Sequence, residues 1–104
     1  MKRVIEGRVY STETAEMVYD WDNGCYTDDF NYCSETLYRT KKGSFFLYGE
    51  GGAMSCYGRS VGRNEWSGGE TLRPLTADQA FRWLEEHSKA EIILKQFPER
   101  VTEA

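Results

Sequence analysis

The sequence predicts an α+β fold, in which a small antiparallel β-sheet carries one or two C-terminal helices on one face. Two β-rich runs within residues 36–48 flank a short turn and indicate a hairpin. Further on, Thr76–Gln79 has the pattern of a helix capping box and precedes apolar residues at helical spacing. A chain of 104 residues has room for one modest core, so we expect a single domain over 1–104 with a flexible tail over about 98–104.

The N-terminal residues predict a short hairpin or a kinked strand, because Val4-Ile5 and Val9-Tyr10 flank a turn at Glu6-Gly7. Thr12–Met17 is compatible with one helical turn capped by its threonine. A strand is the expectation for Met17–Trp21.

The clearest element is the hairpin of residues 36–40 and 44–48, joined by Lys41-Lys42-Gly43. Leu37, Phe45 and Leu47 are the candidates for its buried face. Residues 49–69 then hold seven of the ten glycines, which predicts a long ordered loop with little regular structure.

Gly49–Ser55 resembles a phosphate-binding loop only in its glycines. It lacks the Lys-Ser/Thr ending of a P-loop, and Glu50 would repel a phosphate. The segment is therefore interpreted as a structural turn, with a partner-binding loop as the alternative.

The C-terminal third predicts one strand and two helices. The strand is Glu70–Leu75, where Pro74 indicates an edge or the last residues of the strand. The capping box opens an amphipathic helix that contains Ala77, Ala80, Phe81 and Leu84. A second box at Ser88–Glu91 starts another helix, which Pro98 ends.

Negative charge is concentrated in one part of the chain, although the net charge is only −4. The thirty residues between Arg8 and Arg39 contain no Lys or Arg, and they hold seven acidic residues interleaved with aromatic ones. Such a surface can present carboxylates where phosphates would lie and add aromatic anchors, which suits a basic groove. The competing interpretation is a solvated acidic face with the aromatic residues in the core. The predicted partner-binding residues are Asp20, Asp22, Asp28, Asp29, Glu35, Tyr19, Trp21 and Tyr26.

A second patch combines basic and aromatic residues and would suit contact with RNA or DNA. Its members are Tyr57, Arg59, Arg63 and Trp66. Unlike the acidic surface, this basic patch would bind nucleic acid directly. Its affinity for nucleic acid would weaken steeply with salt.

No catalytic or metal-binding motif is evident. The three cysteines, Cys25, Cys33 and Cys56, lack the spacing of a zinc site, so we expect reduced thiols, no metal, no cofactor and no structural disulfide. His87 lies at the predicted end of a helix, and an enzymatic function would need the fold to bring it to one of these thiols. Because no catalytic motif is evident, we expect that the protein is not an enzyme. Neither a signal peptide nor a membrane-spanning stretch is evident, so we expect a cytoplasmic protein.

The segment "LYRTKKGSFFLYGEGGAMSCYGRSVGRNEWSGGETLRPLT" resembles a family of small proteins carried by phages and other bacterial mobile elements. "YSTETAEMV", "WDNG" and "ADQAFRWLEEH" extend the resemblance over most of the chain. It implies a protein of the bacterial host cytoplasm, similar in character to anti-CRISPR proteins. The implied function is inhibition of a CRISPR effector, or of another nucleic-acid-handling complex, by a DNA mimic. The alternative is a nucleic-acid-binding accessory protein of the mobile element.

Overall fold

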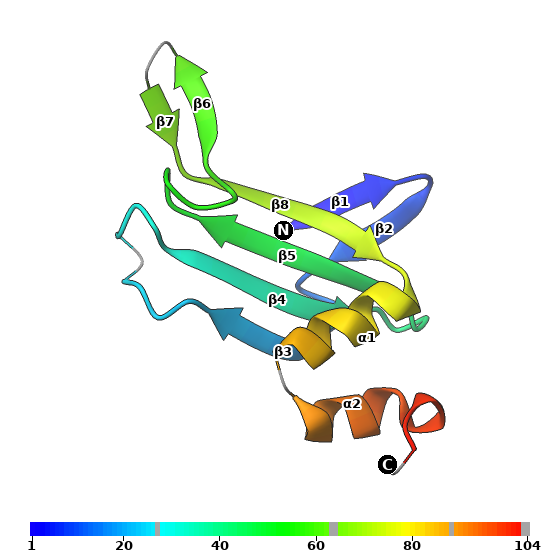
Figure 1. Ribbon diagram of the computed structural model, residues 1–104. Coiled ribbons are helices and arrows are strands. Elements are labelled where there is room, and N and C mark those ends of the chain that lie inside the picture. Colours follow the sequence, from blue (N-terminus) through cyan, green and yellow to red (C-terminus); the bar gives the residue numbers. More distant parts are fainter. Residues whose placement is uncertain (27, 63–64, 88, 103–104) are drawn as a thin grey trace.

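A computed structural model describes residues 1–26, 28–62, 65–87 and 89–102, and it confirms the α+β fold. The central element is a four-stranded antiparallel sheet in the order β3-β4-β5-β8. Its strands are β3 (Glu16–Asp22), β4 (Cys33–Arg39), β5 (Phe45–Gly51) and β8 (Gly69–Leu75). The helices α1 (Ala77–Glu86) and α2 (Ala90–Gln96) cover one face of this sheet (Figure 1).

The hairpin predicted within residues 36–48 is confirmed as β4 and β5, and the pair is longer than expected at the end away from the turn. Alternation along β5 sends Phe45 and Leu47 to the helix side and Phe46 to the other side. All three side chains are buried, because both faces of the sheet are covered. Leu37 of β4 joins the helix side and is fully buried.

The helix-side core is completed by the amphipathic faces of the two helices. Ala80, Trp83 and Leu84 of α1 and Ile93 of α2 pack against the sheet. The predicted capping box is present, because the Thr76 hydroxyl accepts from the Gln79 amide and the Gln79 side chain accepts from the Thr76 amide. Ser88, which the second predicted box requires, lies outside the described residues, and α2 begins after Lys89 without a side-chain cap.

A short hairpin covers part of the opposite face of the sheet. It consists of β1 (Lys2–Ile5) and β2 (Arg8–Ser11), as the sequence predicts. Tyr10 of β2 packs edge-on against Phe46, with ring centroids 5.6 Å apart, and Leu72 of β8 joins this second cluster. The molecule therefore has three layers: helices, sheet and hairpin (Figure 1).

Two predicted segments differ from the structure. Residues 12–15 form turns that lead directly into β3 and contain no helix. The glycine-rich segment contains a third hairpin, β6 (Arg59–Gly62) paired with β7 (Glu65–Ser67), where a loop was predicted. A glycine-rich composition predicts a loop. Residues 59–62 and 65–67 are strands because they pair with each other.

The C-terminal residues 98–102 follow α2 without extending away from the domain. Pro98–Arg100 form the 3-10 helix η1, and Val101 packs against the helix-side core. The guanidinium of Arg100 forms an ion pair with the Asp78 carboxylate of α1. None of the helices described is long and apolar enough to span a bilayer.

Candidate functional site

Two connections leave the sheet at the same end, because the strand register brings the strand ends that they join together. Residue 22 ends β3 opposite Ser34, Cys33 begins β4 opposite Gly51, and Gly51 pairs with Gly69 at the start of β8. We call this region the loop end. It comprises the loop 23–32, the segment 52–68 and the adjoining strand residues Asp22, Glu50 and Glu70 (Figure 1).

Hydrogen bonds join the loop 23–32 to the segment that follows β5. The Gly52 amide donates to the Tyr32 carbonyl over 2.8 Å, and the Met54 amide donates to the Phe30 carbonyl over 2.7 Å. A Cβ at position 52 would lie 2.5 Å from the Asp29 carbonyl oxygen, so a glycine is needed for this close approach. Gly52 therefore serves backbone packing. Residues 49–51, which the structural-turn interpretation included, belong to strand β5, and the turn itself begins only after them.

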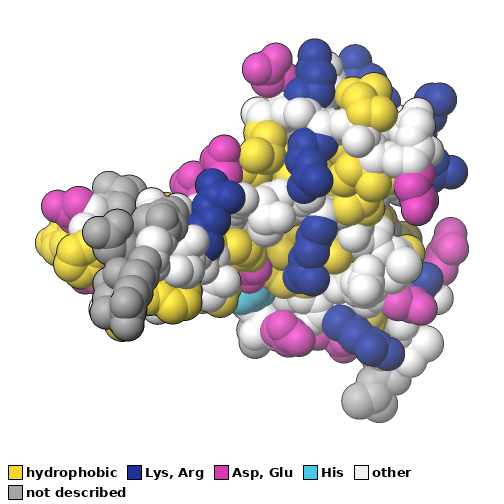
Figure 2. Space-filling model, turned by 90° about the horizontal axis from the view of Figure 1, so that it is seen from above, with side chains coloured by type: hydrophobic (Ala, Val, Ile, Leu, Met, Phe, Trp, Pro, Cys, Tyr) yellow, Lys and Arg dark blue, Asp and Glu magenta, His cyan; other side chains and the backbone are white. Residues whose placement is uncertain are grey.

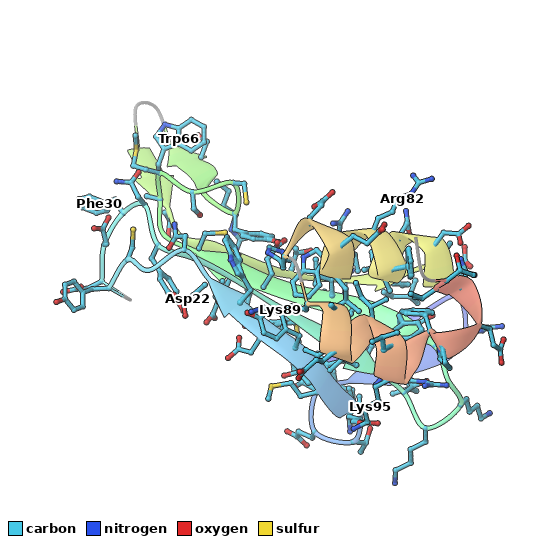
Figure 3. The ribbon with its side chains drawn as sticks, turned by 60° about the horizontal axis from the view of Figure 1, so that its bottom comes forward. Asp22, Phe30, Trp66, Arg82, Lys89 and Lys95 are labelled. Carbon is cyan, nitrogen blue, oxygen red and sulfur yellow. The ribbon has the colours of Figure 1, made fainter. Side chains whose placement is uncertain are left out.

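Four large apolar side chains project into solvent at the loop end. The exposed fractions are 84% for Tyr26, 70% for Phe30, 69% for Met54 and 60% for Trp66. Figure 3 shows Phe30 and Trp66 at this end of the sheet, away from the two helices. Exposed apolar side chains that gather in one region are typical of a binding surface.

The loop end has more acidic than basic residues. Its described residues include one basic residue, Arg59, and these acidic ones: Asp22, Asp28, Asp29, Glu50, Glu65 and Glu70. Figure 2 shows hydrophobic and acidic side chains on the part of the molecule that projects to one side, and most of the visible Lys and Arg side chains lie over the body.

Glu50 and Glu70 face each other directly across β5 and β8. They line an open cleft of about 590 Å³ together with Arg59 and glycine backbone. The Tyr48 hydroxyl lies within hydrogen-bonding distance of both carboxylates, at 3.1 Å from Glu50 Oε2. Burial, followed by these two hydrogen bonds, raises the pKa of Tyr48, so the phenol stays protonated and moderates the repulsion between like charges.

Alternation along β3 separates the predicted aspartates from the predicted aromatic anchors. Tyr19 and Trp21 point to the helix side, where their rings lie 5.9 Å from Trp83 and 4.9 Å from His87 respectively. Asp20 lies on the other face and accepts a hydrogen bond from the Thr36 hydroxyl over 3.1 Å. The core interpretation of the aromatic residues therefore describes these two, whereas Tyr26 is exposed at the loop end.

Two of the predicted aspartates shape the loop that carries them. The carboxylate of Asp22 accepts from the Gly24 amide over 2.8 Å, and that of Asp29 accepts from the Asn31 amide over 2.7 Å. Such bonds from an Asp side chain to a backbone amide two residues later stabilise turns. Asp22, Asp28 and Asp29 are all exposed, so the structure brings these three to one region with Tyr26.

Glu35 has internal hydrogen-bond partners. Its carboxylate accepts from the Tyr57 hydroxyl and from the Trp83 indole nitrogen, the latter over 3.2 Å. Burial and the Glu35 carboxylate raise the pKa of Tyr57, which keeps this donor protonated. Glu35 thus ties the segment after β5 to helix α1.

The predicted basic patch is only partly brought together. Arg59 and Trp66 lie on the β6–β7 hairpin, where Trp66 pairs with Ser60. The Tyr57 ring is half-buried, with its hydroxyl held by Glu35. Arg63 lies outside the described residues.

The residues considered above for catalysis and metal binding are His87 and the cysteines. His87 packs between Trp83 and Trp21, with ring centroids 4.4 and 4.9 Å away. Among the described residues, no group of three or more His, Cys, Asp or Glu side chains is placed to hold a metal ion. The thiols of Cys33 and Cys56 lie 3.8 Å apart at the loop end.

Comparison with known proteins adds no relative. The chain matches no protein-family model, no curated protein and no solved structure. The resemblance to mobile-element proteins therefore stays a prediction.

Phe30, Met54, Glu50 and Glu70 were not among the predicted partner-binding residues. Phe30 belongs to the interleaved acidic and aromatic segment, and that pattern was the signal for it. Glu50 and Glu70 lie outside that segment, and only the register of β5 with β8 brings them to the loop end.

Proposed function

We propose that the chain is a non-catalytic binding protein whose loop end occupies a basic, nucleic-acid-binding surface of a partner complex. The observation that carries the proposal is the gathering of exposed hydrophobic and acidic side chains at one end of the sheet. Following the resemblance, the partner class is a CRISPR effector or a similar nucleic-acid-handling complex. Occupation of that surface would exclude the nucleic acid.

The hydrophobic side chains would supply most of the binding energy. Aromatic residues in the centre of an interface are typical hot spots, whose truncation costs about 2 kcal/mol or more each. Tyr26, Phe30 and Trp66 are the candidates, because their side chains are already exposed and need no rearrangement of the core.

The carboxylates would determine which partner is bound. Charges around an interface steer encounter and reject partners of the same sign. Asp22, Asp28 and Asp29 are exposed next to the aromatic side chains, where they can meet the Lys and Arg side chains that otherwise hold phosphates. An anionic nucleic acid would be repelled by the same residues.

The alternative, direct binding of nucleic acid through Arg59 and Trp66, has less support. Arg59 lines the same cleft as Glu50 and Glu70, so two carboxylates share this cleft with the one described basic residue of the loop end.

The proposal is tested by binding of the purified chain to a panel of guide-loaded CRISPR effector complexes, with and without target DNA. We expect a complex with the effector alone that target DNA prevents, and about 10-fold or greater weakening by Phe30→Ser with Trp66→Ser. The control pair, Val4→Ser with Val9→Ser, removes exposed valines that face each other on β1 and β2. Equal weakening by both pairs, or tight binding to free DNA or RNA, would contradict the proposal.

A further inference from the structure

Two cysteines from different parts of the chain meet at the loop end. Cys33 is the first residue of β4, and Cys56 lies in the turn that follows β5. Their sulfur atoms are 3.8 Å apart, against about 2.05 Å in a disulfide. The third cysteine, Cys25, lies in the loop 23–32.

The two thiols differ in their surroundings. Cys56 is exposed, and Cys33 is half-buried. Burial, the hydrogen bond with Cys56 and the nearby Glu35 carboxylate raise the pKa of Cys33 to about 12. Cys33 therefore stays protonated at neutral pH, and Cys56 is the thiol that a dissolved oxidant can reach.

We infer that Cys33 and Cys56 form a peroxide-sensitive thiol pair, in which Cys56 is oxidised first and Cys33 closes a reversible disulfide. The inference goes beyond the proposed function and does not depend on it. It concerns a covalent modification within the chain, whatever the loop end binds.

The reaction balances with hydrogen peroxide as the oxidant. The sulfur of Cys56 attacks one peroxide oxygen, the O–O bond breaks, and a sulfenic acid forms while the departing hydroxide takes up a proton as water. The sulfur of Cys33 then attacks the Cys56 sulfur and displaces hydroxide, which leaves as water with the proton of Cys33. Overall, two thiols lose two electrons and two protons, and one peroxide becomes two waters.

The disulfide would fix the turn that carries Met54. In the reduced chain this turn is held by hydrogen bonds such as the one that the Gly58 amide donates to the Ser55 carbonyl over 3.0 Å. It also bonds to the loop 23–32 through the Met54 amide. A covalent link from Cys56 to β4 would add a constraint to both segments, so oxidation should slow hydrogen exchange of the amides in residues 52–58.

The test is titration of the full chain with hydrogen peroxide, followed by thiol counting, intact mass and peptide mapping. We expect wild type and Cys25→Ser to form no disulfide between chains, to lose two thiols and two hydrogens, and to recover both with dithiothreitol. Cys33→Ser and Cys56→Ser should form no internal disulfide. The oxidised wild type should melt roughly 10–20 °C higher than the reduced form, because the link closes a loop of about 23 residues.

Three results would overturn the inference. In the first, Cys56 accumulates as sulfinic or sulfonic acid while Cys33 stays reduced. In the second, the mapped disulfide contains Cys25. In the third, oxidation links two chains and leaves no internal bond. Because peptide mapping is done on the wild-type chain, the result does not depend on the folding of any variant.

Discussion

The indole of Trp83 donates a hydrogen bond to the Glu35 carboxylate, from Nε1 to Oε1 over 3.2 Å. The other carboxylate oxygen accepts from the Tyr57 hydroxyl. One acidic side chain thus joins helix α1, strand β4 and the segment after β5 on the helix side of the sheet. This junction connects the loop end, through Tyr57, with the helix-side core.

Glu35→Ala should lower the free energy of unfolding by about 2–4 kcal/mol, because the indole N–H and the phenol would lose their acceptor in a partly buried place. Glu35→Gln keeps one acceptor oxygen and should cost about half as much. Urea denaturation measures both. The control is Glu85→Ala on the exposed part of α1, which should change the free energy by less than about 0.5 kcal/mol. An equal, small effect of the Glu35 and Glu85 variants would contradict this role.

Gly49→Ala should destabilise the fold by about 1–3 kcal/mol, because an added methyl group must displace a packed ring. A Cβ at this position would lie 2.1 Å from Tyr57 Cζ and Oη. Displacement of the ring would also break its bond with Glu35. In a Tyr57→Ser background the same substitution should cost clearly less, which a double-mutant cycle measures. An unchanged cost in that background would show that the strain lies elsewhere.

Most of the sheet and the first helix could be predicted from the sequence, because local patterns specify them. The β-rich runs around Lys41–Gly43 and the box at Thr76–Gln79 encode a turn and a helix start within a few residues. The β6–β7 hairpin could not be predicted in this way. Its strands are short and glycine-flanked, so pairing rather than propensity defines them.

The acidic segment was a useful signal, but it could not show which side of the sheet each residue faces. A bulge between Met17 and Tyr19 changes the alternation, so that Val18 and Tyr19 both pack toward the helices. Glu35 looked like another surface acid, and its two internal donors come from residues 22 and 48 positions away. Sequence spacing carries no information on such contacts.

Stability should fall steeply as pH rises above about 10. The pKa values of Tyr48 and Tyr57 are raised in the folded chain, chiefly by burial, while tyrosines of the unfolded chain ionise near pH 10. The unfolded state then binds fewer protons than the folded state, so the contribution of these groups is full below pH 10 and is lost as pH rises. Urea denaturation at several pH values should give a shallower decline for Tyr48→Phe with Tyr57→Phe. An identical decline would contradict the assignment.

Removal of charge in place tests whether the acidic loop end binds a basic surface. Asp22→Asn, Asp28→Asn and Asp29→Asn together remove three charges, and asparagine can still accept the turn hydrogen bonds of positions 22 and 29. The matched control makes the same change of net charge elsewhere, with Glu13→Gln, Glu85→Gln and Glu91→Gln, all exposed.

The measurement is the affinity of each variant for an effector complex that the wild-type chain binds. It is made between about 50 and 300 mM salt, which spans roughly the physiological range. We expect the aspartate variant to bind about 10-fold or more weakly at low salt and to show a flatter salt dependence, while the control behaves as wild type. Equal affinity and equal salt dependence for the aspartate variant and the wild type would contradict this expectation.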